Sequence, residues 1–462
     1  MAVLPPRQPS PASRTRMATE RDTIAAVATA PGAGGIGIVR VSGPGARGIA
    51  AALCDREPRV RHAHFARFRD GDGEVIDEGI ALLFAAPASY TGEDVLELQV
   101  HGSAPVLAAL LRRCLQLGAR SARPGEFTER AFLEGKLDLA QAEAVADLIA
   151  AGGQSAARAA RRSLQGDFSR QVEALVEQVI ALRVYVEAAM DFPDEQIDFL
   201  AAPELLQRRD DVAAALVALR AGARRGLRLR EGLHVLILGA PNVGKSSLLN
   251  ALAGQDRAIV SDIAGTTRDL LRETLDLDGV VLTLVDSAGL RESPDVIEAE
   301  GIRRAREELG RADLVLAVGD ATHPPRLDAR TRALLPEGAS VLWIHAKCDL
   351  DATPARTESR EEGEHLWLSA RTGAGLEALR ARLREAAGGE NEGGFSARGR
   401  HLDALERASR CLEAAAANLG AGRGELAAED LRQCQQALGE ITGAFAADDL
   451  LGRIFAGFCI GK

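Results

Sequence analysis

A glycine-rich segment, GAPNVGKS at residues 239–246, carries the strongest chemical signal in the sequence. An apolar run precedes it and a helical pattern follows it, so we expect a strand, a tight turn and a helix. In such a turn the backbone N–H groups and the helix N-terminus face phosphate oxygens, Lys245 neutralises charge, and Ser246 binds Mg²⁺. The segment therefore predicts a nucleoside triphosphate site, whereas a purely structural glycine turn would leave Lys245 without a role.

Two later segments supply the other groups that this kind of site needs. DIAGTTRD, residues 262–269, offers Thr266 or Thr267 to complete the magnesium shell. VDSAG places Asp286 at the end of an apolar strand, for an outer contact to Mg²⁺, and directs the Gly289 N–H toward the γ-phosphate. Because the γ-phosphate orders loops of this kind, we expect them to switch with the nucleotide state.

The segment IHAKCDL is typical of a loop that recognises guanine, with one change. Asp349 would accept from the guanine N1–H and exocyclic amine, and Lys347 would lie over the base, but Ala346 stands where such loops carry Asn. LSARTG, residues 368–373, would direct the Ala370 N–H toward the base oxygen. Each hydrogen bond lost with the Asn side chain contributes about 0.5–1.5 kcal/mol, so we predict weaker binding with the guanine preference retained.

The residues expected to contact the nucleotide come from these segments. They are Asn242, Val243, Gly244, Lys245, Ser246, Ser247, Ser261, Thr266, Thr267, Asp286, Gly289, Lys347, Asp349, Ser369 and Ala370. Lys245 is also a catalytic candidate. Leu290 occupies the position where many small GTPases carry a water-orienting Gln, and no arginine finger, which would contribute ~10³ to 10⁵ in rate, can be identified. Hydrolysis therefore needs another device, and a domain that binds nucleotide without turnover is an alternative.

Composition narrows the class of protein. With 56 basic and 66 acidic residues the net charge is −10, which argues against a protein that coats nucleic acid, so any RNA contact must be local. The six cysteines lie far apart without a C-x-x-C pair, which fits neither a disulfide framework nor a zinc site and favours a reducing cytoplasm. No apolar run reaches the roughly 18 to 20 residues of a membrane span.

The pattern of apolar and polar residues along the sequence predicts the elements that must position these groups. We expect residues 1–19 to be a disordered leader, which a misplaced start codon or a transit peptide would explain. Residues 20–136 are expected to form an α+β domain whose strands alternate apolar and polar residues with a period of two. Helical patterns fill 137–231, opening with a capping box at Asp138 and Gln141, and resume at 388–462. Strands and helices alternate between them, which predicts an α/β P-loop domain at 232–387 inserted into an all-α domain.

Over nearly its full length the chain resembles the bacterial tRNA modification GTPases of the MnmE (TrmE) family. The motifs are DTIAAVATAPGAGGIGIVRVSG, YTGEDVLELQVHG, RPGEFTERAFLEGKLDLAQAEAVADLI, GAPNVGKSSLLNALAG, DIAGTTRD, DSAGLRE and the terminal FCIGK. The resemblance implies that the α/β domain is a Ras-like GTPase domain and that the N-terminal domain binds a one-carbon folate and forms a homodimer.

The resemblance also implies that K⁺ replaces the missing arginine, because a monovalent cation would stabilise charge on the phosphates. The family's potassium ligands match Asn242, Ser261, Ile263 and Thr266, and its water-orienting acid matches Glu298. Judged by itself, Glu298 would be a solvated acid in the first turn of a helix.

A second site is implied in the N-terminal domain. The family's one-carbon donor is 5-formyltetrahydrofolate or a related folate, and the matching residues are Arg40, Glu97, Lys136 and Lys462. Carboxylates and a pterin edge are suitable partners for such side chains. Cys459 would lie near the modification site as a candidate nucleophile, although a small core residue is the alternative.

The family product is a 5-carboxymethylaminomethyl or aminomethyl group on the wobble uridine, U34, of certain tRNAs. The flavoprotein partner MnmG (GidA) brings FAD and NADH in a heterotetramer or larger complex. Basic stretches at 161–170 and 220–230 are candidate contacts for tRNA or this partner, or solvated helix faces. The alternative function is a ribosome- or RNA-associated GTPase switch that modifies nothing.

Overall fold

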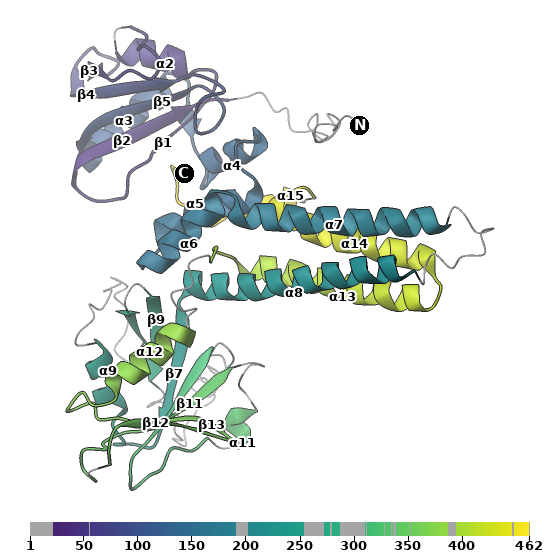
Figure 1. Cartoon of the computed structure of the whole chain (residues 1–462). Coiled ribbons are helices and arrows are strands. Elements are labelled where there is room, and N and C mark those ends of the chain that lie inside the picture. The colour runs from purple at the N-terminus through teal and green to yellow at the C-terminus, as the bar shows by residue number, and fades with distance from the viewer. Residues whose placement is uncertain are drawn as a thin grey trace, which may run out of the picture. The chain divides into compact units, whose positions relative to one another are not determined.

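A computed structural model describes most of the chain (Figure 1). The described residues are 22–54, 56–190, 202–253, 272–277, 280–286, 310, 312–327, 329–333, 335, 339–351, 353–386, 394–445 and 448–461. The chain forms two compact units. One contains the residues up to Ala146 together with those from Phe445 onward, and the other spans Asp147–Ala444.

The first unit is built on a sheet in which strands lie in the order β3-β4-β5-β2-β1-β6. Their bounds are β1 Ile24–Val27, β2 Gly34–Ser42, β3 His64–Arg69, β4 Val75–Phe84, β5 Val95–Gly102 and β6 Arg120–Ser121. Neighbours are antiparallel except β1 and β6, which are parallel. β5 buries Leu96, Leu98 and Val100 and leaves the residues between them partly exposed, which is the predicted period of two.

Helices complete this unit. Leu53 of α2 (Ala46–Leu53) and Leu107 and Leu110 of α3 (Ala104–Gln116) share one buried core with the sheet, including Leu96 and Leu98. The chain continues through α4 (Glu126–Leu133) into α5 (Leu139–Ala150).

The predicted capping box at the start of α5 is confirmed. The Asp138 carboxylate accepts from the Gln141 N–H at 2.8 Å, and the Gln141 side chain accepts from the Asp138 N–H at 2.9 Å. Two backbone donors that would lack helical partners are thereby satisfied, so the sequence pattern determines where this helix begins.

The C-terminal segment belongs to the same unit. After α15 (Asp448–Ala456), Phe455 and Phe458 pack against Leu139 and Ala142 in a small buried cluster. The two phenylalanine rings contact each other with centroids 5.4 Å apart. Residues more than 300 positions apart in sequence therefore share a core.

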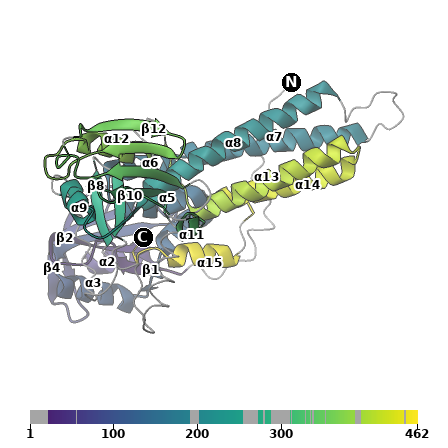
Figure 2. The same cartoon turned by 90° about the horizontal axis from the view of Figure 1, so that it is seen from below.

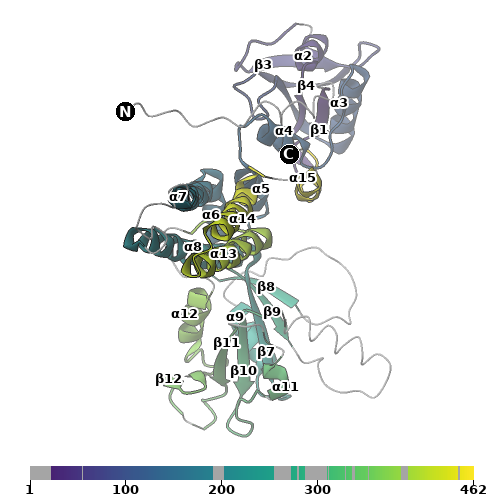
Figure 3. The same ribbon diagram turned by 90° about the vertical axis from the view of Figure 1, so that its right-hand side faces the viewer.

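The second unit contains long helices that pack side by side, as Figures 2 and 3 show from below and nearly end-on. They are α7 Asp167–Met190, α8 Pro203–Glu231, α13 Gly399–Gly420 and α14 Gly424–Thr442. The buried residues of α7 are Phe168, Ser169, Val172, Leu175, Val179, Leu182 and Val186. From Val172 onward they alternate spacings of three and four, the pattern of helices that pack nearly parallel in a bundle.

A buried carboxylate joins the two points at which the chain leaves and re-enters this bundle. Asp147 of α5 accepts from Arg230 Nε at 2.8 Å, at the end of α8, and from Arg398 Nη2 at 2.7 Å, just before α13. Its other oxygen accepts from the Ser396 hydroxyl at 3.3 Å. The Asp147 side chain is only 5% exposed, so this contact is a buried ion-pair network rather than a surface one.

Close backbone packing reinforces the same place. Phe395 stacks on Phe168 of α7 with ring centroids 4.5 Å apart. A Cβ added at Gly226 of α8 would lie 2.2 Å from the Phe395 carbonyl oxygen, so only glycine fits there. The Ser396 N–H donates to the Ala159 carbonyl of α6 (Gln154–Leu164) at 3.2 Å.

The chain between α8 and α13 forms an α/β domain. Its strands follow the order β12-β13-β11-β10-β7-β9-β8 in the sheet. The bounds are β7 Leu233–Gly239, β8 Arg272–Leu277, β9 Val280–Asp286, β10 Leu314–Gly319, β11 Ser340–His345, β12 Arg356–Arg360 and β13 Gly363–Trp367. The central strands are parallel, and β8 and β12 pair antiparallel at the edges.

Helices cover the sheet of this domain. Leu248 and Leu252 of α9 (Lys245–Ala253), with Leu379 and Leu383 of α12 (Leu376–Ala386), share the main core with the sheet. Leu236 and Val315 belong to a second, smaller cluster. The short helix α11 spans Ala329–Arg332.

These observations confirm the predicted fold class, an α+β domain, a helical domain and an inserted α/β domain. Among the helices of the described residues, none has the length and apolar character that crossing a bilayer requires.

Candidate functional site

The glycine-rich segment forms the predicted strand, turn and helix. β7 ends at Gly239 and α9 begins at Lys245, so the turn points out of one end of a buried parallel strand. A Cβ at Gly239 would lie 2.2 Å from the Val318 carbonyl oxygen, and Gly244 has φ +109°. These two positions therefore need glycine for packing and for backbone conformation, respectively.

The Lys245 side chain is held against the turn. Its ammonium donates to the Gly239 carbonyl at 3.2 Å and to the Ala240 carbonyl at 3.0 Å, and the residue is buried. Ser246 and Ser247 follow in the first turn of α9. A positive charge fixed beside a helix N-terminus is the arrangement that binds phosphate groups.

The two predicted base loops emerge beside each other. β11 and β13 are parallel neighbours in which His345 pairs with Trp367, so the loops that follow leave from the same edge. The Cys348 N–H donates to the Leu368 carbonyl at 3.2 Å. A hydrogen bond from Ser369 is the main reason that the pKa of Asp349 lies below its usual value. An ionised Asp349 is the form that accepts from guanine.

Ala346 has a defined structural role. It is buried in the main core of the α/β domain together with Val243 of the phosphate-binding turn. Its N–H donates to the Gly319 carbonyl at 2.7 Å, and its Cβ would lie 3.7 Å from a Cβ placed on Gly244. At Ala346 the loop therefore packs against the phosphate-binding turn and is hydrogen-bonded to the end of β10, without the amide that Asn would provide.

Lys347 links the base loop to the phosphate loop. Its ammonium donates to the Asn242 carbonyl at 2.5 Å and to Asp320 Oδ2 at 2.8 Å. Both Lys347, with φ 60°, and Asn242, with φ 64°, adopt the left-handed conformation that is uncommon outside glycine. Sequence reasoning missed Asp320, although its position directly after the apolar run LVLAVG marks the end of a strand.

A stack of aromatic rings lies behind the base loops. His345 stacks on Trp367 with centroids 4.1 Å apart and planes within 3°, and His345 Nε2 lies 3.0 Å from His365 Nδ1. Arg356 of β12 lies over the other side of this stack, 4.1 Å from the Trp367 centroid. Burial, followed by the charges of His365 and Arg360, lowers the pKa of His345 to about 4.

Several predicted residues lie outside the described part of the chain. They are Ser261, Ile263, Thr266, Thr267, Gly289, Glu298 and Lys462. Asp286 is the last residue of β9, and its backbone pairs with Ile237 of β7, two residues before Gly239. In the described residues, no group of three or more His, Cys, Asp or Glu is arranged to hold a metal ion. The metal-binding roles predicted for Ser261, Ile263, Thr266 and Thr267 therefore remain predictions.

The first unit brings Arg40 and Glu97 together. They are opposite each other on β2 and β5, and the Arg40 guanidinium is 2.9 Å from Glu97 Oε1. The same guanidinium lies over two aromatic rings, 5.6 Å from the Tyr90 centroid and 5.7 Å from that of Phe127. Sequence reasoning did not identify these rings. Lys136 bonds the Pro87 carbonyl at 3.0 Å, in the loop that carries Tyr90.

The segment around Cys459 is attached to the same unit through its backbone. The Cys459 carbonyl accepts from the Gly125 N–H at 3.3 Å, and Ile460 pairs with Pro124. A Cβ at Gly461 would lie 2.1 Å from the Val27 carbonyl oxygen. The Cys459 side chain itself is exposed, so the interpretation of it as a small core residue is wrong.

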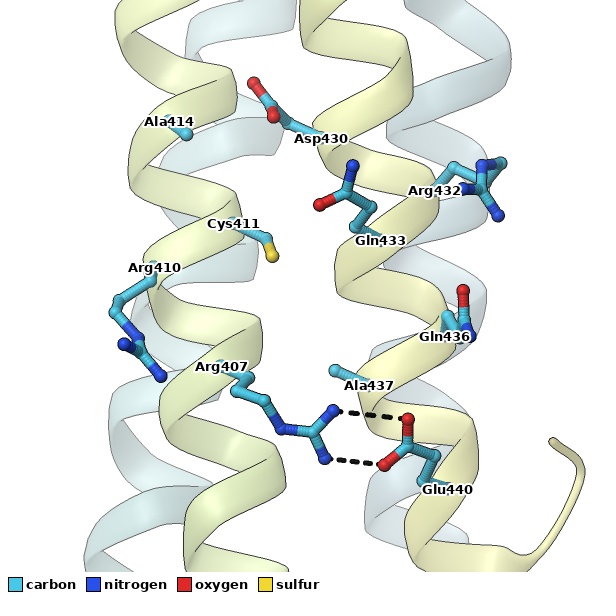
Figure 4. A pocket seen from close by; sticks show the side chains of 10 residues that line it. All are labelled: Arg407, Arg410, Cys411, Ala414, Asp430, Arg432, Gln433, Gln436, Ala437 and Glu440. Atoms are coloured by element: carbon cyan, nitrogen blue, oxygen red, sulfur yellow. Dashed lines mark hydrogen bonds and ion pairs between the residues drawn. The ribbon is translucent and has the colours of Figure 1, made fainter. Parts of the chain in front are cut away.

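A groove on the helical bundle contains none of the predicted site residues (Figure 4). It has a volume of about 600 Å³ and is lined by α13 and α14. Its lining residues are Arg407, Arg410, Cys411, Ala414, Asp430, Arg432, Gln433, Gln436, Ala437 and Glu440. Arg407 bridges the two helices through both oxygens of Glu440, at 3.2 and 2.5 Å. This paired arginine stabilises the seam between the helices.

The fold and this site define a P-loop GTPase domain inserted into a helical bundle, preceded by an α+β domain. Comparison with known proteins gives the family. The profile described as the MnmE helical domain matches residues 139–459, and that of the GTP-binding protein TrmE N-terminus matches residues 23–136.

A tRNA modification GTPase MnmE from Pseudomonas paraeruginosa is 57% identical over 455 residues, covering 96% of this chain and all of that protein. One from Xanthomonas campestris is 57% identical over 444 residues, covering 95% of this chain and 99% of that protein. The chain belongs to the family of tRNA modification GTPases MnmE. Among solved structures, the G domain of the T. maritima FeoB iron transporter is 25% identical with a TM-score of 0.24, covering 34% of this chain and 98% of that one.

Proposed function

We propose that this protein is a potassium-activated GTPase that acts with a flavoprotein in the 5-carboxymethylaminomethyl modification of U34 in certain tRNAs. The main structural support is that the phosphate loop and the guanine loop meet through Lys347 and Asn242. The chain also matches tRNA modification GTPases over almost its whole length. The two halves of a GTP site are thus held together in the protein itself.

The phosphate end of the site is suited to hydrolysis. The fixed ammonium of Lys245 stabilises charge that develops on the phosphates, and the Ser246 hydroxyl and Thr267 are oxygen donors suited to Mg²⁺. Asn242, Ser261, Ile263 and Thr266 would likewise hold K⁺ through oxygen atoms. Potassium, when bound, supplies positive charge beside the transferred phosphoryl group. Glu298 would orient the attacking water.

The one-carbon site is proposed around Arg40. Its guanidinium combines a carboxylate partner, Glu97, with the faces of Tyr90 and Phe127, which suits a ligand that has both a flat ring and charged groups. Lys136 and Lys462 would supply further positive charge for the tail of 5-formyltetrahydrofolate or a related folate. The protein would work in the cytoplasm as a homodimer, and the partner, MnmG (GidA), would carry out the redox step with FAD and NADH.

The GTPase part is tested by steady-state hydrolysis of GTP and ATP in potassium and in sodium. We expect GTP-specific turnover that potassium stimulates and that Lys245→Ala abolishes. Equal turnover in both cations would refute potassium activation. Equal turnover of both nucleotides would refute guanine recognition by Asp349.

The modification part is tested by nucleoside mass spectrometry of tRNA incubated with the protein, its flavoprotein partner, GTP and the one-carbon folate. We expect Arg40→Ala to weaken folate binding and lower the yield of modified U34. The matched control is Arg67→Ala, which removes an arginine from another cross-strand pair, with Glu78, whose two side chains are exposed. Folate binding that is unaffected by Arg40→Ala, or GTP turnover with no modified uridine, would favour an RNA-associated switch instead.

A further inference from the structure

An acidic residue that no motif contains lies at the centre of the contact between the two nucleotide loops. Asp320 follows the last residue of β10, and its side chain is 10% exposed. One oxygen, Oδ1, accepts from the N–H and hydroxyl of Thr322, at 3.1 and 2.7 Å, and from the His323 N–H at 2.9 Å. These bonds fix the orientation of the carboxylate.

The second oxygen, Oδ2, faces the base loop and accepts from the Lys347 ammonium at 2.8 Å. The same ammonium donates to the Asn242 carbonyl at 2.5 Å, in the turn that leads into Gly244 and Lys245. A continuous chain of polar contacts thus runs from the end of β10, through Asp320 and Lys347, to the phosphate-binding turn. Each link joins residues far apart in sequence, so folding of the α/β domain creates it.

This connection matters because of Ala346. An Asn at this position would offer side-chain hydrogen bonds for holding the base loop, whereas Ala346 offers only its backbone N–H, which donates to the Gly319 carbonyl. Lys347 has a long flexible side chain, and ordering such a side chain costs up to about 2 kcal/mol. A partner that orders it before the nucleotide arrives lowers the cost of binding.

We propose that Asp320 is a positioning residue that fixes Lys347 between the two loops and so takes over the role of the missing Asn in setting guanine-nucleotide affinity. This inference rests on the GTP site of the proposed function. An isolated ion pair between exposed side chains contributes little. Asp320 differs because three other hydrogen bonds already hold its carboxylate and because Lys347 has a second partner in the phosphate-binding turn.

The test is a double-mutant cycle read by the dissociation constant for GDP, measured with a fluorescent GDP analogue and by calorimetry. Asp320→Asn keeps an oxygen for the Thr322 and His323 N–H groups while removing the charge that faces Lys347. We expect a roughly 5- to 10-fold weaker affinity. In a Lys347→Ala background the same substitution should change affinity less than about twofold, because the partner is already gone.

The second arm uses the residue that Asp320 is proposed to replace. In an Ala346→Asn background, the effect of Asp320→Asn should shrink to about twofold or less, because the amide restores a link between the loops. The control is Asp351→Asn, an equal change of charge two residues beyond Asp349, which should leave affinity within about twofold. If Asp320 only stabilised its own turn, the effect of Asp320→Asn would be the same in the Ala346→Asn background and in the Lys347→Ala background as in the wild-type protein.

Three outcomes would overturn the inference: an unchanged affinity in Asp320→Asn, an equal loss in Asp351→Asn, or an equal loss with and without Lys347. Should Asp320→Asn fail to fold, Asp320→Glu retains the charge but moves the carboxylate by one methylene, and wild-type affinity in that variant would also overturn it. These binding results are separate from tRNA modification. A wild-type protein that binds GDP and modifies no uridine would refute the proposed function alone.

Discussion

Replacement of Asp147 by Asn should destabilise the helical bundle selectively. The carboxylate is 5% exposed and accepts from Arg230 and Arg398, whose side chains are 31% and 19% exposed. Removing one partner of a fully buried ion pair costs about 3–5 kcal/mol. Because both arginines can reach water, we expect the free energy of unfolding to fall by about 2 kcal/mol.

The assay separates the parts of the chain. Both tryptophans, Trp343 and Trp367, lie in the α/β domain, so their fluorescence follows that domain, while far-UV circular dichroism is dominated by the long helices. In urea, a loss of about 2 kcal/mol lowers the midpoint by roughly 0.7–1 M for a slope of 2–3 kcal/mol/M. We expect this shift in the dichroism transition and a smaller one in fluorescence.

A matched control removes another ion pair of the bundle. Glu406 of α13 pairs with Arg220 of α8 at 2.8 Å, but its side chain is 53% exposed. Glu406→Gln should change the free energy of unfolding by less than about 0.5 kcal/mol. A wild-type midpoint in Asp147→Asn, or equal shifts of the midpoint in the two variants, would show that burial of the ion pair has no effect on stability.

Three further predictions concern packing, pH and chemistry. Gly226→Ala should lower the free energy of unfolding by about 1–3 kcal/mol, because the new methyl group would meet the Phe395 carbonyl oxygen. Gly48→Ala, where the new methyl group would lie in open space on a helix, should raise the free energy of unfolding by about 0.5–1 kcal/mol. Urea titrations measure both changes. The pKa of His345 falls from 6.5 to about 4 on folding. The unfolded chain therefore binds more protons between these values, and tryptophan fluorescence should show constant stability above pH 6.5 and a loss of up to about 2 kcal/mol toward pH 4. Cys459→Ser should leave stability unchanged, because only the backbone of this residue packs, so any loss of U34 modification measured by mass spectrometry would report on the thiol.

The pH prediction has its own control. His345→Phe keeps a ring against Trp367 but cannot be protonated, so most of the acid-induced loss should disappear. Persistence of the full loss in His345→Phe would assign it to other groups. Equal changes in the free energy of unfolding for Gly226→Ala and Gly48→Ala would contradict the close approach described for Gly226.

Local patterns predicted the elements well because their causes are local. The apolar run before Gly239 and the glycine-rich turn before Lys245 placed β7 and α9 correctly. Asp138 and Gln141 marked the start of α5, because the cap depends only on residues three positions apart. Asp349 and Ser369 were each predicted to contact the nucleotide, and both follow parallel strands that end at the same edge, but the hydrogen bond between them was not predicted.

Other features depend on contacts that no local pattern records. Asp320 and Lys347 are 27 positions apart, and their contact requires that β10 and β11 lie side by side in register. Tyr90 and Phe127 reach Arg40 from two different segments, so a single sequence could not connect them. The strand-ending position of Asp320 was the available signal, because ligand-binding residues gather at the carboxyl ends of parallel strands.

The place of the C-terminal segment has a consequence for synthesis on the ribosome. Leu139 and Ala142 emerge early, but the phenylalanines that cover them, Phe455 and Phe458, are translated more than 300 residues later. Domains generally fold in order from the N-terminus as the chain is made. The first unit cannot complete its core in that way, so its apolar face stays exposed until the helical bundle and the α/β domain have been synthesised. A chain truncated before Phe455 should leave that face exposed and prone to aggregation.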